Sequence, residues 1–273
     1  MRDHQTFSNE EYNYILEYLE RDPNLNIFFL SNLAYKPRHV KFFALNCGEY
    51  NCFGYIATKP SLFGEIRGDS KQCSRLIEYI KEIKGDKYVV ITEEMKQYLA
   101  PYLILNNLSI IEVMYLDREE FNYQKSSPQN NCRMLSLDDI PMLAYIYGVD
   151  KKLAFTIYHN LSPLCGYYLD GSLVAVAGTL ARYKKVWMLG GVYTSPKHRG
   201  KGYCRDTLSV WLEQAFKDAD KVIVWVKEDN IPAKRLYKSL GFKKYRKKLY
   251  MIHLRSHNSI FLAKFLKNLF YLP

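Results

Sequence analysis

Two glycines and four basic residues stand between an apolar run and a helical pattern, in the stretch SPKHRGKGYC. Gly200 and Gly202 carry no Cβ, so the backbone there can come close to a ligand. If a helix begins at about residue 203, its first N–H groups lack intrahelical partners and its dipole adds positive potential. Full positive charges come from Lys197, Arg199 and Lys201. The segment is either a basic surface turn or a cradle for phosphate, and the flanking strand and helix favour the cradle.

This turn differs from two common phosphate-binding loops. The chain has no GxxxxGK[ST] segment, which excludes a P-loop, and no GxGxxG segment, which excludes a Rossmann fingerprint. A second patterned stretch, NIPAKRLYKSLGF, follows at residues 230–242, one strand later. Two motifs in a fixed order, with one element between them, are far more specific than either motif alone.

Together the two stretches resemble the GNAT superfamily of acyl-CoA-dependent N-acyltransferases. Residues 199–204 match its R/Q-x-x-G-x-G/A signature, with Cys204 standing where the family has Gly or Ala. Residues 230–242 match the pattern N-x-x-A-x-x-L-Y-x-x-L-G-F. The resemblance covers about residues 131–254. It implies an N-acetyltransferase that uses acetyl-CoA as co-substrate and passes the acetyl group to a primary amine by direct attack.

The resemblance also implies roles for single residues. Backbone groups of the turn would hold the CoA pyrophosphate, and backbone groups of the preceding strand would meet the pantetheine arm. Gly190-Gly191 suits the bulge that splays this strand from its neighbour. Tyr237 would be the general acid that protonates the departing thiolate. The expected cofactor-binding residues are Val192, Thr194, Arg199, Gly200, Lys201, Gly202, Tyr203, Cys204 and Asn230.

The expected general base is not assigned. The strand VWMLGGVYT, where many GNAT proteins carry a Glu, has no acidic residue. Glu228 and Asp229 end the neighbouring strand and could act through water. His198 fits a phosphate-side or surface position, and His159 fits a lone surface histidine. Tyr237 itself could be a core residue in a chain with 24 tyrosines, but its place in the full motif favours catalysis.

Hydrophobic periodicity predicts an α/β fold (α+β, with a mixed sheet) in which the order of elements is loosely repeated. In the first half we expect a helix over 7–22 with Ser8 and Glu11 as a capping box, two strands in 41–58 about Gly48-Glu49, a helix over 69–83, and strands over 87–92 and 109–118.

In the second half we expect a helix after Ser136 and Asp139 and three strands in 165–194 with a hairpin at Asp170-Gly171. These are followed by a helix over 203–218, a strand over 221–228, a short helix over 231–241 and a last strand over 247–254.

These elements predict a smaller GNAT-like domain over 1–124, a polar linker over 124–131 and a catalytic GNAT domain over 131–254. The first domain is expected to be non-catalytic, buttressing the second or shaping its pocket. FGEIRGDSKQC stands where its phosphate turn should be, and the acidic Glu65 and Asp69 would repel phosphate. Residues 255–273 predict an amphipathic helical tail, packed on the domains, across a dimer or on a membrane surface.

Composition leaves the partner classes open. The formal net charge is +11, which suits a phosphate-bearing cofactor, an acidic substrate, nucleic acid or a solvated lysine-rich surface. Six cysteines without a CxxC pair predict reduced thiols and no metal site. No signal peptide or transmembrane run is seen, so a cytoplasmic protein is expected.

A small-molecule or peptide amine is the expected acceptor, with the oligomeric state open. The alternatives are a non-catalytic CoA-binding regulatory module and a basic-surface nucleic-acid binder, although no motif specific for nucleic acid is present.

Overall fold

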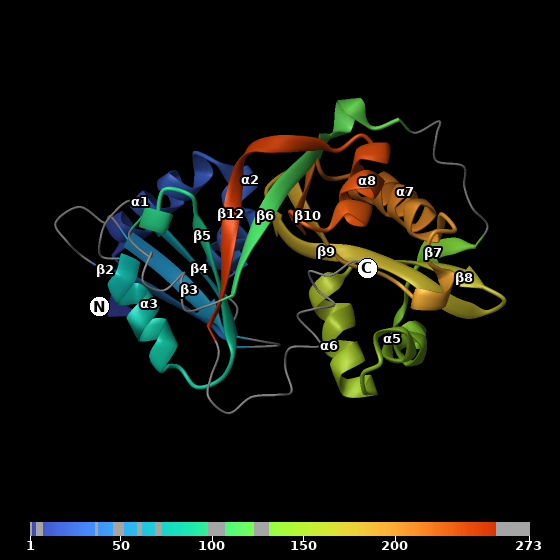
Figure 1. The fold of residues 1–273 in the computed structure, drawn as a ribbon, viewed down its shortest axis with the longest axis horizontal. Helices are drawn as coiled ribbons and strands as arrows, with labels where there is room; N and C mark the ends of the chain where they lie inside the picture. Colours follow the sequence, from blue (N-terminus) through green and yellow to red (C-terminus); the bar gives the residue numbers. More distant parts are fainter. Residues whose placement is uncertain are drawn as a thin grey trace. The chain divides into compact units, whose positions relative to one another are not determined.

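The computed structural model describes residues 2–3, 8–35, 38–45, 52–58, 62–68, 73–97, 107–122 and 131–254. The chain forms two compact mixed α/β units (Figure 1). Unit 1 holds the residues up to Glu112 and the segment that starts at Arg246, and unit 2 is built mainly from Val113–Tyr245. The domain limits expected from the sequence stay a prediction. The turn at Gly48-Glu49, Asp69, nearly all of the linker and the tail after residue 254 lie outside the described residues.

Among the described residues, unit 1 contains α-helices and strands from both ends of the chain. Its elements are β1 (Arg2–Asp3), α1 (Asn9–Glu20), α2 (Pro23–Tyr35), β2 (Val40–Leu45), β3 (Cys52–Ala57), β4 (Leu62–Gly68), α3 (Cys73–Glu82), β5 (Lys87–Thr92) and the part of β12 (Lys243–Leu254) after Tyr245. The strand order is β1-β2-β3-β4-β5-β12. The β4–β5 pair is parallel and the other pairs are antiparallel.

The predicted start of α1 is confirmed. Ser8 Oγ accepts from the Glu11 backbone N–H at 3.1 Å, and the Glu11 carboxylate accepts from the Ser8 N–H at 2.7 Å. This reciprocal pair satisfies two N–H groups that the helix leaves without partners. Leu19 and Ile15 then bury one face of the helix.

Three predictions for unit 1 need correction. Helix α2 was not expected, because its sequence is apolar nearly all round and shows no helical contrast between faces. The segment 62–68 is the buried strand β4 and not a turn, so Glu65 lies inside the sheet. The strand after residue 247 was expected to complete the second half, but Leu249–Leu254 pair with β5 of unit 1.

Unit 2 carries both sequence motifs. Its strand order is β6-β11-β10-β9-β8-β7. The elements are β6 (Asn107–Asp117, in this unit from Val113), β7 (Cys132–Met134), α5 (Ile140–Tyr147), α6 (Lys151–Leu161), β8 (Cys165–Leu169), β9 (Ser172–Tyr183), β10 (Val186–Thr194), α7 (Tyr203–Ala215), β11 (Lys221–Lys227) and α8 (Ile231–Ser239). Helices α5 and α6 lie on the opposite side of β9 from α7 and α8 (Figure 1).

Most predicted elements of unit 2 are confirmed, and two were missed. The β8–β9 hairpin turns at Asp170 and Gly171, whose φ angles of 49° and 75° are those of a tight hairpin turn. Ser136 and Asp139 form a capping box ahead of α5. Helix α6 and the short strand β7 were not expected. Among the described residues, no helix is long and apolar enough to cross a membrane.

Candidate active site

Strands β10 and β11 separate partway along their length. Their parallel ladder joins Val186–Met188 to Lys221–Ile223, and no further pair forms between the two strands within residues 131–254. Against β9, the register of β10 shifts between Gly190 and Tyr193, which is the bulge that the sequence predicts. The two irregularities together open a wedge between β10 and β11.

Gly191 makes this bulge possible. Its φ of 61° lies in the left-handed region, and a Cβ there would stand 2.3 Å from the Leu161 side chain. Its carbonyl accepts a hydrogen bond of 2.6 Å from the Tyr147 hydroxyl, which comes from α5. Burial raises the pKa of Tyr147, with smaller contributions from Tyr193 and Cys204, so the phenol keeps the proton that this bond needs. The contact joins residues far apart in sequence, and no local motif signals it.

A narrow pocket of about 20 Å³ lies in the wedge. Its lining includes Leu180, Val192, Trp225, Asn230, Ala233 and Tyr237. The motif residues of β10 and α8 are thus brought together, although more than 35 residues separate Val192 from Asn230 in sequence. Leu180 was not expected. Its Cβ would stand 2.6 Å from a Cβ at Gly190, so it closes the pocket from β9.

Tyr237 is buried on α8, with 3% of its surface exposed. Its ring centroid lies 5.6 Å from that of Phe242. Burial raises the pKa of Tyr237 well above its ordinary value, and Cys204 adds a smaller contribution. The Tyr237 phenol is therefore protonated at neutral pH.

Asn230 is the N-cap of α8. Its side-chain oxygen accepts from the Ala233 backbone N–H at 3.2 Å. Asn230, which the sequence predicts to face the cofactor, therefore also stabilises α8, because this bond satisfies one of the first N–H groups of the helix.

A larger pocket of about 510 Å³ opens over the glycine turn, and Ala233 lines both pockets. Gly200 and Gly202 have φ angles of 73° and 88°, and a Cβ added at either would meet nothing within 4 Å. Gly202 is the N-cap of α7 and offers no side chain to its first N–H groups. Those N–H groups, the helix dipole and the open space are what an anion site would use, so the predicted anion site at this turn stays a prediction.

The turn residues divide between lining and support. Thr194, Arg199, Gly200, Gly202, Tyr203 and Cys204 line the larger pocket, together with Arg205, which the motif did not indicate. Arg199 Nε donates to the Thr194 carbonyl at 3.2 Å, so it also fixes the turn to the end of β10. Lys201 is exposed in the same turn.

The first two residues of α7, Tyr203 and Cys204, shape the start of the helix. Burial raises the pKa of Cys204 to about 12, partly offset by the Thr194 hydroxyl. A thiol in this state is a packing group and not a nucleophile. The ring of Tyr203 lies 4.5 Å from that of Tyr167, centroid to centroid, which anchors the first turn of the helix.

The four residues considered as a base lie outside the lining of the narrow pocket. Asp229 is exposed and Glu228 is half-buried. His159 is exposed on α6, where its ring packs against Phe155 and Tyr158. His198 lines the larger pocket, and its phosphate-side role stays a prediction. A residue acting as base is therefore not assigned within 131–254.

Unit 1 has a corresponding parallel strand pair, β4 and β5, and its ladder ends at Glu65 and Val90. Leu62 pairs with Lys87 at the start of the β4–β5 ladder, as Val186 pairs with Lys221 in unit 2. Arg67 is the fifth residue after Leu62, and Gly191 is the fifth residue after Val186. The two residues therefore occupy equivalent positions in their strands. The largest side chain of the strand thus replaces the residue that opens the gap.

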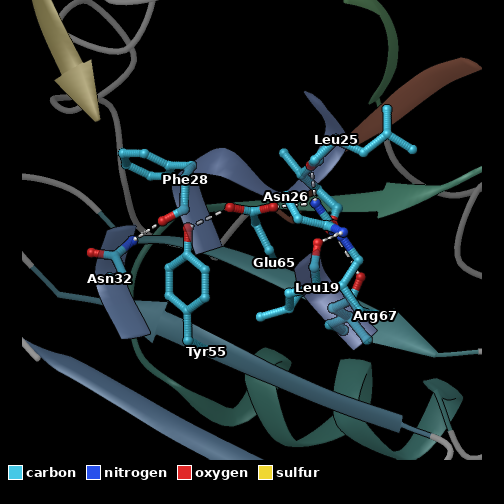
Figure 2. A network of polar contacts seen from close by, with 10 residues as sticks. Leu19, Leu25, Asn26, Phe28, Asn32, Tyr55, Glu65 and Arg67 are labelled. Carbon is cyan, nitrogen blue, oxygen red and sulfur yellow. Dashed lines mark hydrogen bonds and ion pairs between the residues drawn. The ribbon is translucent and has the colours of Figure 1, made fainter. Parts of the chain in front are cut away.

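Arg67 fills the gap with a saturated polar network (Figure 2). Its guanidinium donates to Asn26 Oδ1 at 2.6 Å, to the carbonyls of Leu25 at 2.9 Å and Val90 at 3.2 Å, and to the Glu65 carboxylate. Glu65 also accepts from the Tyr55 hydroxyl at 2.7 Å. Glu65, Arg67 and Tyr55 are fully buried. Glu65 is therefore buried against Arg67 and does not present its charge at a surface turn, where the sequence predicts that it would repel phosphate.

Comparisons with known proteins agree with this arrangement. Residues 132–242 match the model of the Acetyltransferase (GNAT) family. This part of the chain is a GNAT domain. A UPF0039 protein of Schizosaccharomyces pombe is 28% identical to the chain over 120 residues, which cover 42% of this chain and 80% of that protein.

Solved structures extend the likeness of fold beyond the GNAT domain. A tandem GNAT protein from the clavulanic acid biosynthesis pathway has a TM-score of 0.62 at 11% identity, covering 92% of this chain and 97% of that one. A GCN5-related N-acetyltransferase from Sphaerobacter thermophilus has a TM-score of 0.60 at 12% identity, covering 89% and 95%. At these identities the likeness is one of fold. It confirms the predicted mixed α/β class and the resemblance to two-part GNAT proteins.

Proposed function

We propose that the protein is an N-acetyltransferase that moves the acetyl group of acetyl-CoA to a primary amine. One observation carries this proposal: the wedge that holds Tyr237 adjoins the open glycine turn through Ala233. A long ligand with phosphates at one end and a reactive group at the other fits such a pair of pockets.

The proposed binding mode uses backbone groups for most of the ligand. The pyrophosphate lies over Gly200 and Gly202, against the first N–H groups of α7 and beside Arg199 and Lys201. The pantetheine arm runs along β10 past Val192 and Thr194, beyond the point at which the ladder with β11 ends. Tyr203 and Cys204 support the turn, and Asn230 holds the start of α8. The thioester then reaches the narrow pocket.

In the proposed reaction the amine nitrogen attacks the thioester carbonyl carbon, and the carbon–sulfur bond breaks. The leaving thiolate takes the proton of Tyr237, and the amine gives up its extra proton to water. The phenol regains a proton when the products leave. Direct attack of this kind needs no covalent intermediate on the protein.

The roles of the other parts of the chain are also proposals. We assign catalysis to residues 131–254 and a non-catalytic role to residues 1–124, in keeping with the filled gap at Arg67. A cytoplasmic protein that acts on a small-molecule or peptide amine fits the sequence. A non-catalytic CoA-binding module would share the glycine turn but would have no use for a phenol in the wedge.

Binding of acetyl-CoA to Gly202→Glu tests the cofactor site. The new carboxylate enters the open space over the turn and repels phosphate, so we expect the Kd for acetyl-CoA to rise at least tenfold (about 1.4 kcal/mol). Calorimetry at low and high salt measures this change.

Gly171→Glu is the matched control for this experiment. Gly171 also has a positive φ, and a Cβ there would also meet nothing within 4 Å. The variant therefore adds the same backbone strain and the same charge at the β8–β9 hairpin, and it should bind normally. Equal loss of binding in both variants would remove the turn from the proposal, as would a wild-type protein that binds no acetyl-CoA.

Leu180→Ala tests the limit on acyl length. Leu180 covers Gly190 and lines the narrow pocket, whose volume is about 20 Å³. Removing three carbons should raise kcat/KM for propionyl-CoA relative to acetyl-CoA by roughly tenfold, within the range of a few methylene contacts. The ratio is measured with both thioesters on one acceptor amine. An unchanged ratio in a folded variant would place the acyl group elsewhere.

A further inference from the structure

Two cysteines meet in the core of unit 1. Cys52 is the first residue of β3 and Cys73 is the first residue of α3. Their Sγ atoms lie 2.9 Å apart. Both side chains are buried, with 1% and 0% of their surface exposed, and both are present as thiols.

This separation is close to that of a covalent bond. Sulfur atoms of a disulfide are about 2.05 Å apart, so an approach of less than 1 Å would join the two thiols. Each side chain is held by its surroundings. Cys52 stands opposite Gly68 in the β3–β4 ladder, and Cys73 packs in the same apolar cluster as Leu76 and Ile77.

A shared metal ion does not explain the pair. No group of three or more metal-ligating side chains occurs among the described residues, and structural zinc sites use four ligands. Packing alone would not require a second sulfur beside Cys52, since the apolar cluster that holds both thiols also contains aliphatic side chains such as Ile77 and Ile80.

We propose that Cys52 and Cys73 are a redox pair that forms a reversible disulfide by exchange with a small-molecule disulfide such as glutathione disulfide. One thiol, after losing its proton, attacks a glutathione sulfur and releases the first glutathione. The second thiol then attacks the cysteine sulfur of this mixed disulfide and releases the other glutathione. Two protein thiols are oxidised by two electrons, and one glutathione disulfide is reduced to two glutathione molecules.

The disulfide would tie β3 to α3 across 21 positions of sequence. A cross-link of this span restricts the unfolded chain and leaves the folded chain nearly unchanged, so oxidation raises the stability of unit 1. Because both sulfurs are buried, exchange proceeds through local opening at the start of α3 and is slow.

The test equilibrates the full-length protein with glutathione mixtures that run from fully reduced to fully oxidised. After acid quenching, thiols are alkylated in denaturant and the protein is digested for mass spectrometry. We expect a cross-linked peptide joining Cys52 to Cys73, the loss of two alkylated sites and a Tm higher by roughly 5–10 °C.

Cys52→Ser and Cys73→Ser should each abolish the cross-link and the Tm shift, whereas Cys132→Ser, in unit 2, should keep both. The wild-type peptide map decides the matter even if a serine variant fails to fold. The proposal is overturned if both cysteines remain alkylated at the oxidised end, if each carries a glutathione, or if the cross-link lowers Tm.

Discussion

Replacing Tyr237 with Phe is expected to lower kcat by roughly 10²–10⁴ while the Kd for acetyl-CoA changes less than twofold. The substitution removes one hydroxyl from a buried ring and leaves the contact with Phe242 in place. Only the proton for the departing thiolate is lost, so the effect falls on the chemical step and not on binding. Steady-state kinetics and calorimetry on the same preparation separate the two.

Tyr167→Phe is the matched control for this loss. Tyr167 is also a buried tyrosine of unit 2, with 5% of its surface exposed, but it lines neither pocket. Its hydroxyl accepts one hydrogen bond, from Asn131 at 3.3 Å. We expect its kcat to stay within a factor of two of the wild type. A full kcat in Tyr237→Phe would take the phenol out of the mechanism.

The pH profile gives an independent measure of the same group. Because burial raises the pKa of Tyr237, the acid form persists to higher pH than in an ordinary tyrosine. Any alkaline fall of kcat that disappears in Tyr237→Phe should therefore lie above the ordinary tyrosine pKa of about 10. A fall near pH 8 that survives in the variant would belong to another group.

Replacing Arg67 with Ala is expected to lower the free energy of unfolding by roughly 3–5 kcal/mol. The guanidinium is fully buried, and its removal leaves the Glu65 carboxylate without its positive partner. It also leaves the carbonyls of Leu25 and Val90 without a donor. Urea denaturation followed by circular dichroism measures the loss.

The loss in Arg67→Ala should depend on pH. Burial raises the pKa of Glu65, and Arg67 is the largest influence that lowers it. Without Arg67 the folded-state pKa rises further above the unfolded value, so the native state binds the extra proton and stability falls as pH increases. We therefore expect a larger loss at pH 8 than at pH 5.

Two further variants set the scale for Arg67. Arg75→Ala removes an exposed arginine from α3 and should cost less than about 0.5 kcal/mol. The double variant Arg67→Met/Glu65→Gln removes both charges and should cost less than Arg67→Ala alone, because no buried charge is left unpaired. A double variant as unstable as the single one would mean that the hydrogen bonds, and not the charges, dominate.

The parts of the site that could be predicted from sequence are those carried by contiguous motifs. Gly200 and Gly202 define their turn by backbone freedom, and Tyr237 stands in a pattern that one short helix contains. Tyr147 and Leu180 could not be predicted, because each reaches the wedge through a contact with a distant part of the chain. Only the folded sheet shows that they belong there.

The same distinction explains the errors in unit 1. Two charged residues inside LFGEIRG break the apolar run that signals a buried strand, and their mutual pairing becomes visible only in three dimensions. The pairing of β12 with β5 is likewise non-local. The hydrophobic pattern correctly predicted strands over residues 87–92 and 247–254. It holds no information on which strands pair with each other.

The place of β12 has a consequence for how the protein is made. Val113–Tyr245 is continuous in sequence, so most of unit 2 can fold as soon as it has left the ribosome. Unit 1 is synthesised first, yet β5 gains its neighbour only when Leu249–Leu254 emerge. Throughout the synthesis of unit 2, the edge of β5 is open to pairing with other chains. The half of the protein that is translated first is therefore the half that finishes folding last.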